Sequence, residues 1–108
     1  MSWIEIIKVQ TAERQAAEAC WNFLNAFEHE SAEYISAEIS IYSHAAFSLH
    51  QLIHLHWHSE HPVMPSSKVS EMLIHELKQF GLVDHSIWTT GPVPTRSSGI
   101  GQLSEISF

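Results

Sequence analysis

The sequence predicts an α+β fold built around an antiparallel β-sheet, and three observations lead to this prediction. Residues 47–59, FSLHQLIHLHWHS, alternate between apolar side chains and a second series rich in histidine, which is typical of a β-strand whose two faces meet different surroundings. Two other stretches carry apolar residues at helical spacing, and three more are short and rich in β-branched residues. At 108 residues, with 44% hydrophobic and 16% charged residues, the chain is long enough for one domain with its own core.

The N-terminal part of the chain is predicted to form a strand followed by a helix. Residues 3–10 are rich in β-branched side chains and form the first predicted strand. A helix is predicted over residues 12–28, with Thr11 as its N-cap. Its apolar stripe recurs at helical spacing and comprises Ala16, Cys20, Phe23, Leu24 and Phe27. Because Cys20 lies in the middle of this stripe, we interpret it as a small buried hydrophobic residue rather than a nucleophile.

Residues 33–42 also alternate in polarity, and they are predicted to pair with the histidine-rich strand. The apolar faces of the two strands lie on the same side only if the numbers of paired residues add to an even value. Pairing Ile41 with Phe47 satisfies this condition and places Glu38 opposite His50. A register shifted by two residues satisfies it as well, so the pattern leaves both registers open.

A second helix is predicted to begin near residues 66–67, and a fourth strand to cover residues 82–90. The apolar stripe of this helix comprises Val69, Met72, Leu73, Leu77 and Phe80. Gly81 follows the stripe and is predicted to be the left-handed residue that ends the helix. Glu76 falls at the edge of the stripe, whereas His75 points away from it.

Composition and charge exclude several classes of partner. The formal net charge is −7 and the five basic residues are scattered, so we expect no binding to nucleic acid or to a membrane surface. The single cysteine excludes an intramolecular disulfide and a multi-cysteine zinc site. The N-terminal residues do not have the pattern of a signal peptide, and no apolar run approaches the ~18 residues of a membrane span. We therefore expect a cytoplasmic protein.

The element order β-α-β-β-α-β is that of the ferredoxin-like fold, in which two helices cover one face of a four-stranded antiparallel sheet. Residues 1–93 form this predicted domain, and residues 94–108 form a tail that we expect to pack on the domain or on a dimer partner. The face without helices would carry His, Ser, Tyr and Glu mixed with apolar residues such as Leu52. Because such a face is too apolar to be simply solvated, we predict a homodimer formed through it.

The chain resembles a known family in its length, its element order and the segment Trp57-His58-Ser59 at the end of its third strand. These features are similar to the dimeric α/β-barrel superfamily, and in particular to its antibiotic-biosynthesis-monooxygenase-like members. The resemblance implies two sheets that form a barrel across a dimer. It also implies a small-molecule pocket between sheet and helices in each subunit, where Trp57 would lie. Members of the superfamily include cofactor-independent quinol-type oxygenases and haem-degrading enzymes.

The first functional hypothesis is a pocket for a small organic molecule, of aromatic or quinol type, on which the protein would act as a monooxygenase-like enzyme without a cofactor. Trp57 would line the pocket, together with Trp3 or Trp88. Glu5 or Glu76 would supply the polar group, because a carboxyl group removed from water has a raised pKa that suits proton transfer. The candidate catalytic residues are therefore Trp57, Glu76 and Glu5.

The alternative hypotheses use the histidine face of the third strand. A site for zinc or another transition metal is one of them, because two imidazoles at alternate positions of a strand project from the same side. Its candidate ligands are His50, His54, His56 and Glu38, with His58 as a further one. A histidine beside the tryptophan pocket would instead bind haem iron. The third hypothesis is a dimeric module without enzymatic activity, whose nine histidines make its interface sensitive to pH between about 5 and 7.

Overall fold

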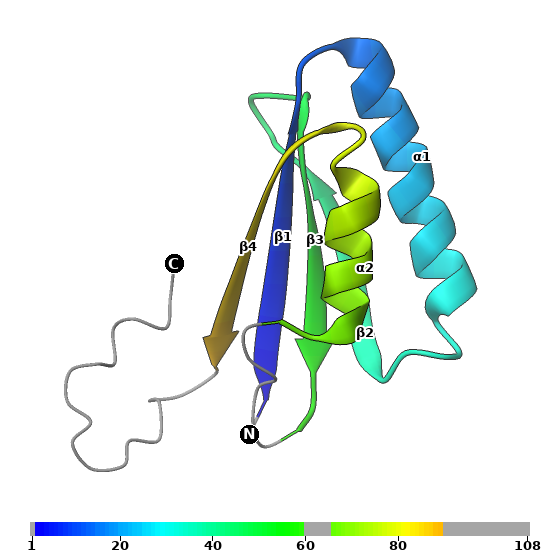
Figure 1. Cartoon of the computed structure of the whole chain (residues 1–108), viewed down its shortest axis with the longest axis vertical. Helices are drawn as coiled ribbons and strands as arrows, with labels where there is room; N and C mark the ends of the chain where they lie inside the picture. Colours follow the sequence, from blue (N-terminus) through cyan, green and yellow to red (C-terminus); the bar gives the residue numbers. More distant parts are fainter. Residues whose placement is uncertain (1, 60–65, 90–108) are drawn as a thin grey trace, which may run out of the picture.

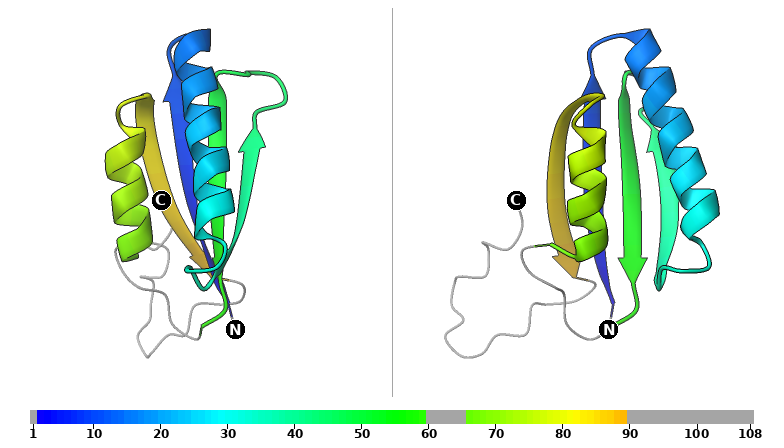
Figure 2. Two further views of the ribbon diagram at one scale, coloured as in Figure 1. Left: turned by 90° about the vertical axis from the view of Figure 1, so that its right-hand side faces the viewer. Right: turned by 45° about the vertical axis from the view of Figure 1, so that its right-hand side comes forward.

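Six elements follow one another in the computed structural model, which describes residues 2–59 and 66–89. They are β1 (Trp3–Thr11), α1 (Arg14–Ser31), β2 (Ala37–Ser43), β3 (His50–Trp57), α2 (Lys68–Leu77) and β4 (Gly81–Thr89). The strands form one antiparallel sheet in the order β2-β3-β1-β4, and both helices lie against the same face of it (Figure 1, Figure 2). The predicted ferredoxin-like α+β fold is therefore confirmed.

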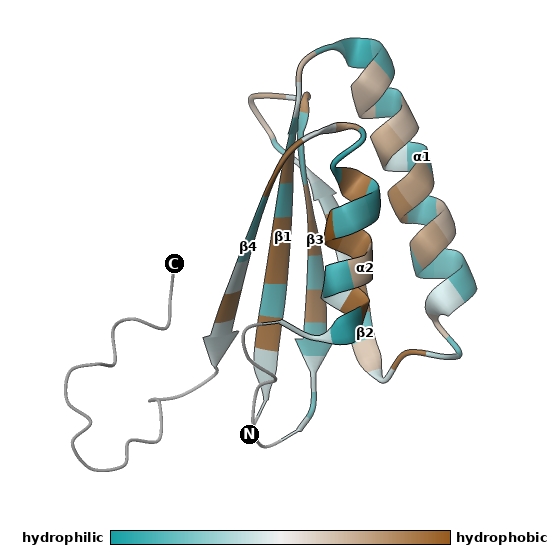
Figure 3. Cartoon of the chain, viewed as in Figure 1, coloured by the Kyte–Doolittle hydropathy of each residue, from teal (hydrophilic) through white to brown (hydrophobic). Residues whose placement is uncertain are grey.

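The hydrophobic core lies between the sheet and the two helices. Alternate residues of β1 and β3 point into it, which gives these strands alternating bands of hydropathy (Figure 3). The buried cluster comprises Ile7, Val9, Cys20, Leu24, Phe27, Ile53, Leu55, Leu73 and Leu77. Cys20 is fully buried, as the sequence predicts, and this burial raises the pKa of its thiol to about 11.

The start of α1 differs from the prediction. Thr11 is not its N-cap but the last residue of β1, and it is held there because its backbone N–H and its hydroxyl both donate to the carbonyl oxygen of Leu49, at 3.0 and 2.7 Å. The helix begins at Arg14, with Glu13 at the N-cap position, and it extends to Ser31. Pairing across the sheet therefore outweighs the capping preference of threonine.

The start of α2 agrees with the prediction, but its end does not. Ser67 is the N-cap, and its hydroxyl accepts from the backbone N–H of Ser70 at 3.1 Å. Met72, predicted to be in the apolar stripe, is exposed, and Ser70 is buried instead. Gly81 is not a left-handed cap: it opens β4 opposite Thr11, where a Cβ atom would collide with the backbone of the neighbouring strand. Glycine is needed there for close strand approach rather than for a turn.

Both registers that the sequence left open between the second and third strands are wrong. Ile41 lies opposite Ile53, so Glu38 lies opposite His56 and not His50. The even sum of paired numbers holds, because it follows from the apolar alternation alone. The register itself is set by the connection over residues 44–49, where the backbone N–H of His44 donates to the carbonyl oxygen of His50 at 2.9 Å. Residue 47 thus belongs to this connection instead of to the strand.

The second face of the sheet, which we call the open face, carries the even-numbered residues of all four strands. No helix in the described part of the chain covers it (Figure 2). Its large apolar side chains are Ile4, Ile6, Tyr42, Leu52, Leu82 and Trp88. Within residues 2–59 and 66–89, no helix is long and apolar enough to cross a membrane. The predicted tail, residues 94–108, lies outside the described residues.

Candidate small-molecule site

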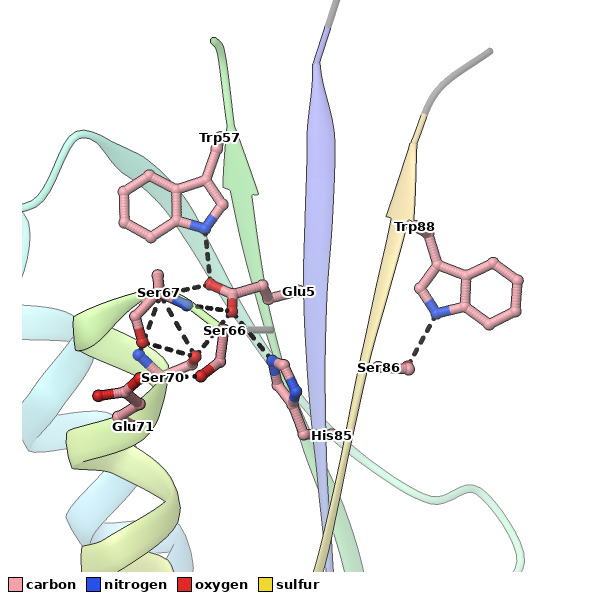
Figure 4. Close-up of polar contacts among 9 residues, drawn as sticks. All are labelled: Glu5, Trp57, Ser66, Ser67, Ser70, Glu71, His85, Ser86 and Trp88. Carbon is pink, nitrogen blue, oxygen red and sulfur yellow. Dashed lines mark hydrogen bonds and ion pairs between the residues drawn. The ribbon is translucent and has the colours of Figure 1, made fainter. Parts of the chain in front are cut away.

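A buried carboxylate lies at the centre of the candidate site. Glu5 is the third residue of β1 and points toward the helices, between the side chains of Trp3 and Ile7. Its exposed fraction is 0%. A glutamate side chain is almost never buried so completely unless its carboxylate has partners. Five hydrogen bonds converge on it from β3, from β4 and from the N-terminus of α2 (Figure 4).

The two carboxylate oxygens share these bonds. Oε1 accepts from Nε1 of Trp57 at 2.9 Å and from the hydroxyl of Ser67 at 2.5 Å. Oε2 accepts from the backbone N–H of Ser67 at 3.0 Å, from the hydroxyl of Ser70 at 2.7 Å and from Nε2 of His85 at 2.9 Å. Because Ser67 is the N-cap of α2, the carboxylate also lies at the positive end of the helix dipole. These donors and the dipole offset the cost of burying a charge.

Burial and hydrogen bonding shift the pKa of Glu5 in opposite directions. Removal from water is the largest single effect and raises the pKa, but the bonds from Ser67, Ser70 and His85 together lower it below its ordinary value of 4.5. The predicted raised pKa is therefore wrong, because the sequence does not reveal the donors that surround the carboxyl group. Glu5 is a fixed anion at neutral pH, which can orient partners but does not suit proton transfer.

Two stacked tryptophans lie beside this carboxylate. Trp3 and Trp57 lie opposite each other in β1 and β3, and their rings stack with centroids 5.6 Å apart and planes at 19°. The indole N–H of Trp3 donates to the hydroxyl of Ser59 at 2.7 Å, as that of Trp57 donates to Glu5. Of the two alternatives for the second tryptophan, the structure thus places Trp3 beside Trp57.

The other two predicted site residues lie elsewhere. Trp88 projects from the open face, where its indole N–H donates to the hydroxyl of Ser86 at 2.8 Å (Figure 4). Glu76 lies six residues beyond Ser70 in α2, which is about 9 Å along a helix that rises about 1.5 Å per residue. The structure therefore brings together Trp57 and Glu5 of the candidate catalytic residues, and not Glu76.

His85 joins the site from β4, a role that the sequence does not reveal. It lies opposite Ile7 and so points to the helix face of the sheet, where its Nε2 meets Glu5. Since an ionised carboxylate only accepts hydrogen bonds, Nε2 carries the proton of this contact. The side chain is 16% exposed, whereas Glu5 has no exposed surface. The available signal is the alternation of Val83, His85 and Ile87, which places His85 in an otherwise apolar series.

The fold is similar to several solved structures. A candidate antibiotic biosynthesis monooxygenase from Deinococcus radiodurans superposes with a TM-score of 0.60 at 13% sequence identity, over 87% of this chain and 97% of that chain. Rv0793 from Mycobacterium tuberculosis gives a TM-score of 0.60 at 13% identity, over 90% and 100%. SnoaB, a cofactor-independent oxygenase from Streptomyces nogalater, gives 0.53 at 10% identity, over 86% and 97%.

The chain has the ferredoxin-like fold of the antibiotic-biosynthesis-monooxygenase-like proteins. At these identities the likeness concerns the fold. No protein-family model matches the sequence, and no curated protein sequence matches it. The fold likeness agrees with the resemblance inferred from the order of elements and from the end of the third strand. The fold alone does not assign a function to the side chains of the site.

The histidines of the open face are divided between its two ends. His50 lies at the start of β3, with its ring 5.6 Å from that of Phe47 and 6.0 Å from that of His44. His54 packs edge-on against Tyr42, and burial, followed by the charge of neighbouring His56, lowers the pKa of His54. At the other end of β3, His56 and His58 approach the carboxylate of Glu38. The four predicted metal ligands therefore do not form one cluster, because the true register moves Glu38 away from His50.

The site on the helix face combines three chemical capacities. Trp3 is buried and covers one face of Trp57, so the partly exposed Trp57 is the aromatic side chain that an aromatic molecule can contact. The Glu5–His85 pair is a carboxylate–imidazole dyad, in which the carboxylate fixes the orientation of the ring and stabilises a positive charge that develops on it. The two serines saturate the carboxylate and so keep it ionised. Because its donors keep Glu5 ionised, the imidazole of His85 is the group in this arrangement that is chemically suited to accept a proton.

Proposed function

We propose that this protein binds a small aromatic or quinol-type molecule beside Trp57 and oxidises it with O2 without a cofactor, as a homodimer. The observation that carries the proposal is that one buried carboxylate, Glu5, contacts His85 at 2.9 Å and the indole N–H of Trp57, which stacks on Trp3, at 2.9 Å. An imidazole that is oriented by the same carboxylate as an aromatic side chain suits the removal of a proton from a phenolic or activated C–H group. The fold likeness to SnoaB, a cofactor-independent oxygenase, supports the same reaction class.

Each residue has a defined role in this proposal. Trp57 positions the aromatic ring of the substrate, and Trp3 holds the indole ring of Trp57 in place by stacking on its other face. His85 accepts the substrate proton, and Glu5 orients its ring through Nε2. The substrate anion is electron-rich enough to react with O2 directly. When an activated CH2 group is oxidised to a carbonyl group, one oxygen atom enters the product and the other leaves as water, with all electrons supplied by the substrate. When a quinol is oxidised to a quinone, its two electrons and two protons pass to O2, which leaves as hydrogen peroxide.

Oxygen consumption by the full chain tests the enzymatic part, with hydroquinone and dithranol as the small and the tricyclic probe. In the variant His85→Gln the amide can still donate to Glu5, but the residue no longer accepts a proton. We expect kcat to fall by about 10²–10⁴-fold, the range that a general base contributes. His75→Gln, on the exposed face of α2, is the matched control and should leave kcat unchanged. Equal rates in the wild type and His85→Gln would remove His85 from the mechanism, and a wild type inert toward both probes would favour a non-enzymatic module.

The open face supports the homodimeric part of the proposal. Leu82 is 74% exposed, and Tyr42 and Trp88 are exposed on the same face. Large apolar side chains gathered on one uncovered sheet face are costly in water, and a second copy of the same face buries them by two-fold symmetry. The polar residues between them, such as His54 and Lys8, lie beside this apolar surface and would be part of the interface.

Sedimentation of two charge variants tests the dimer. Trp88 on the open face and Met72 on α2 are both 46% exposed, so they differ in the face that carries them and not in their accessibility. We expect Trp88→Glu to give a monomer, because it places a charge in the apolar interface, and Met72→Glu to sediment like the wild type. A wild-type monomer at micromolar concentration would contradict the interface, and so would a Trp88→Glu variant that remains dimeric.

A further inference from the structure

We propose that Glu38, His56 and His58 form a binding site for a late first-row divalent metal ion such as Zn²⁺. One ligand atom from each of these residues lies within 4.8 Å of those of the other two. His56 is at the end of β3 and lies directly opposite Glu38 of β2, and His58 follows two residues later on the same side. All three residues are among the candidate ligands in the sequence, but the expected register places Glu38 opposite His50 and does not distinguish these three from His50 and His54.

Two of the distances between possible ligand atoms are close to those of a tetrahedral zinc site. Nδ1 of His56 lies 3.5 Å from Oε1 of Glu38, and Nε2 of His58 lies 3.4 Å from Oε2. In a tetrahedron the distance between two ligands is about 1.6 times the bond length, which gives about 3.3–3.4 Å for bonds of about 2.0–2.1 Å. The two histidine–glutamate distances are close to this value, and the ligand nitrogens of the two histidines lie within 4.8 Å of each other, so rotations of these side chains would bring the three ligands around one ion.

The hydroxyl group of Ser2 can fix the tautomer of His56 that metal binding requires. Nε2 of His56 lies 3.1 Å from Oγ of Ser2, while its Nδ1 faces Glu38. If Nε2 donates its proton to the serine, Nδ1 presents a lone pair toward the cluster. Metal-binding histidines commonly have a hydrogen-bond partner of this kind on the second nitrogen, which fixes the tautomer and the ring orientation.

The chemistry of the ligands selects the type of ion. Imidazole suits zinc, copper and nickel, whereas calcium and magnesium prefer oxygen ligands, of which only Glu38 is present. Two histidines and one carboxylate provide three ligands and leave the fourth position to water. In the single chain the Glu38 side chain is 72% exposed, and it lies on β2, an edge strand of the sheet, so the site is at the border of the open face.

The metal site is independent of the tryptophan site. Trp57 lies between His56 and His58 in the chain and points to the helix face, whereas the two histidines point to the open face. No residue is shared by the two sites, so loss of one does not imply loss of the other. Metal binding can therefore be tested separately from substrate oxidation.

Calorimetric titration with Zn²⁺ tests the site in the full chain, purified without a histidine tag and freed of metal. We expect one ion per chain. His58→Ala and Glu38→Gln each remove a ligand and should weaken binding by at least about 100-fold, and Ser2→Ala should weaken it by about 10-fold. His50→Ala is the matched control, since His50 lies on the same face of β3 at its other end, and it should bind like the wild type.

Co²⁺ supplies a second readout of the same site. Tetrahedral coordination should give strong visible absorption in the wild type and in His50→Ala, and not in His58→Ala. The proposal is overturned if the wild type binds no Zn²⁺, or if His58→Ala and His50→Ala bind equally. It is also overturned if several weak ions bind in place of one tight ion. Because His58 is exposed, its replacement should leave the fold intact, and far-UV circular dichroism verifies this.

Discussion

Replacement of Glu5 by glutamine is predicted to destabilise the fold strongly, although the two side chains have nearly the same shape. The amide oxygen can take the place of Oε2 and keep the three bonds from Ser67, Ser70 and His85. The amide nitrogen then faces Nε1 of Trp57 at 2.9 Å, where two N–H groups oppose each other. The hydroxyl of Ser67 can rotate and accept, but the indole N–H cannot.

The loss of unfolding free energy in Glu5→Gln can be worked out from these hydrogen bonds. An unsatisfied buried donor costs about 1–3 kcal/mol, and a bond to a charged group stabilises by about 1 kcal/mol more than a neutral one. The three bonds that remain change from bonds to a charged group into bonds to a neutral group. This change adds about 3 kcal/mol to the loss of unfolding free energy. Relief from burying a charge offsets part of this sum, and a net loss of roughly 3–5 kcal/mol remains, as for other buried pairs that lose a partner.

The pH dependence of this loss is a second part of the same prediction. The pKa of Glu5 is lower in the folded protein than its ordinary value of 4.5, so its contribution to stability is complete above that value. The contribution is lost as the pH falls through the lower, folded-state pKa. The difference between the wild type and Glu5→Gln should therefore be largest near pH 7 and should shrink below about pH 4.5.

Urea unfolding followed by circular dichroism at several pH values measures this difference. Glu13→Gln is the control, because Glu13 is exposed and its side chain makes no capping hydrogen bond, and its effect should stay within about 0.5 kcal/mol. The reasoning is refuted if Glu5→Gln is as stable as the wild type at pH 7. It is also refuted if the loss is large but independent of pH, since the carboxylate charge would then not be its cause.

Three further predictions follow from single residues. Cys20, with a pKa raised to about 11 by burial, should react with a thiol reagent at pH 8 only after unfolding, and rapid reaction in the native protein would contradict its place in the core. Gly81→Ala should shift the urea midpoint sharply, because the new Cβ would lie 2.8 Å from the carbonyl carbon of Gln10, and an unchanged midpoint would argue against this strand pairing. Ser67→Ala removes both the cap of α2 and a donor to Glu5, so it should cost more than the ~1 kcal/mol of an ordinary cap, whereas Ser66→Ala should cost little.

The sequence predicts the fold better than it predicts the site, and the reason is the range of the interactions. Alternation and helical spacing are local, and they identified all six elements and the face of β3 that meets the core. Glu5 was identified as a candidate, but its partners Ser67, Ser70 and His85 lie 62, 65 and 80 residues away. No local pattern indicates that a serine cap and a strand histidine meet one carboxylate.

The register of β2 and β3 illustrates the same limit. The apolar pattern requires the numbers of paired residues to add to an even value. Several registers meet this condition, and the choice among them depends on the connection over residues 44–49. There, Nδ1 of His44 accepts from the backbone N–H groups of Ala46 and Phe47, both at 3.0 Å. This arrangement ends β2 and delays β3, and it brings Glu38 to His56 and His58. The observed register therefore differs from the expected one by six residues, and the partner of Glu38 changes from His50 to His56.

The most direct test of the central claim is the response of the four indole N–H signals in a nitrogen–proton correlation spectrum to hydroquinone and dithranol. An aromatic molecule bound beside Trp57 should shift the signals of Trp57 and Trp3, which stack together, and leave those of Trp21 and Trp88 in place. Shifts confined to Trp21 or Trp88, or none at any indole with either probe, would contradict a small-molecule site between the sheet and α2.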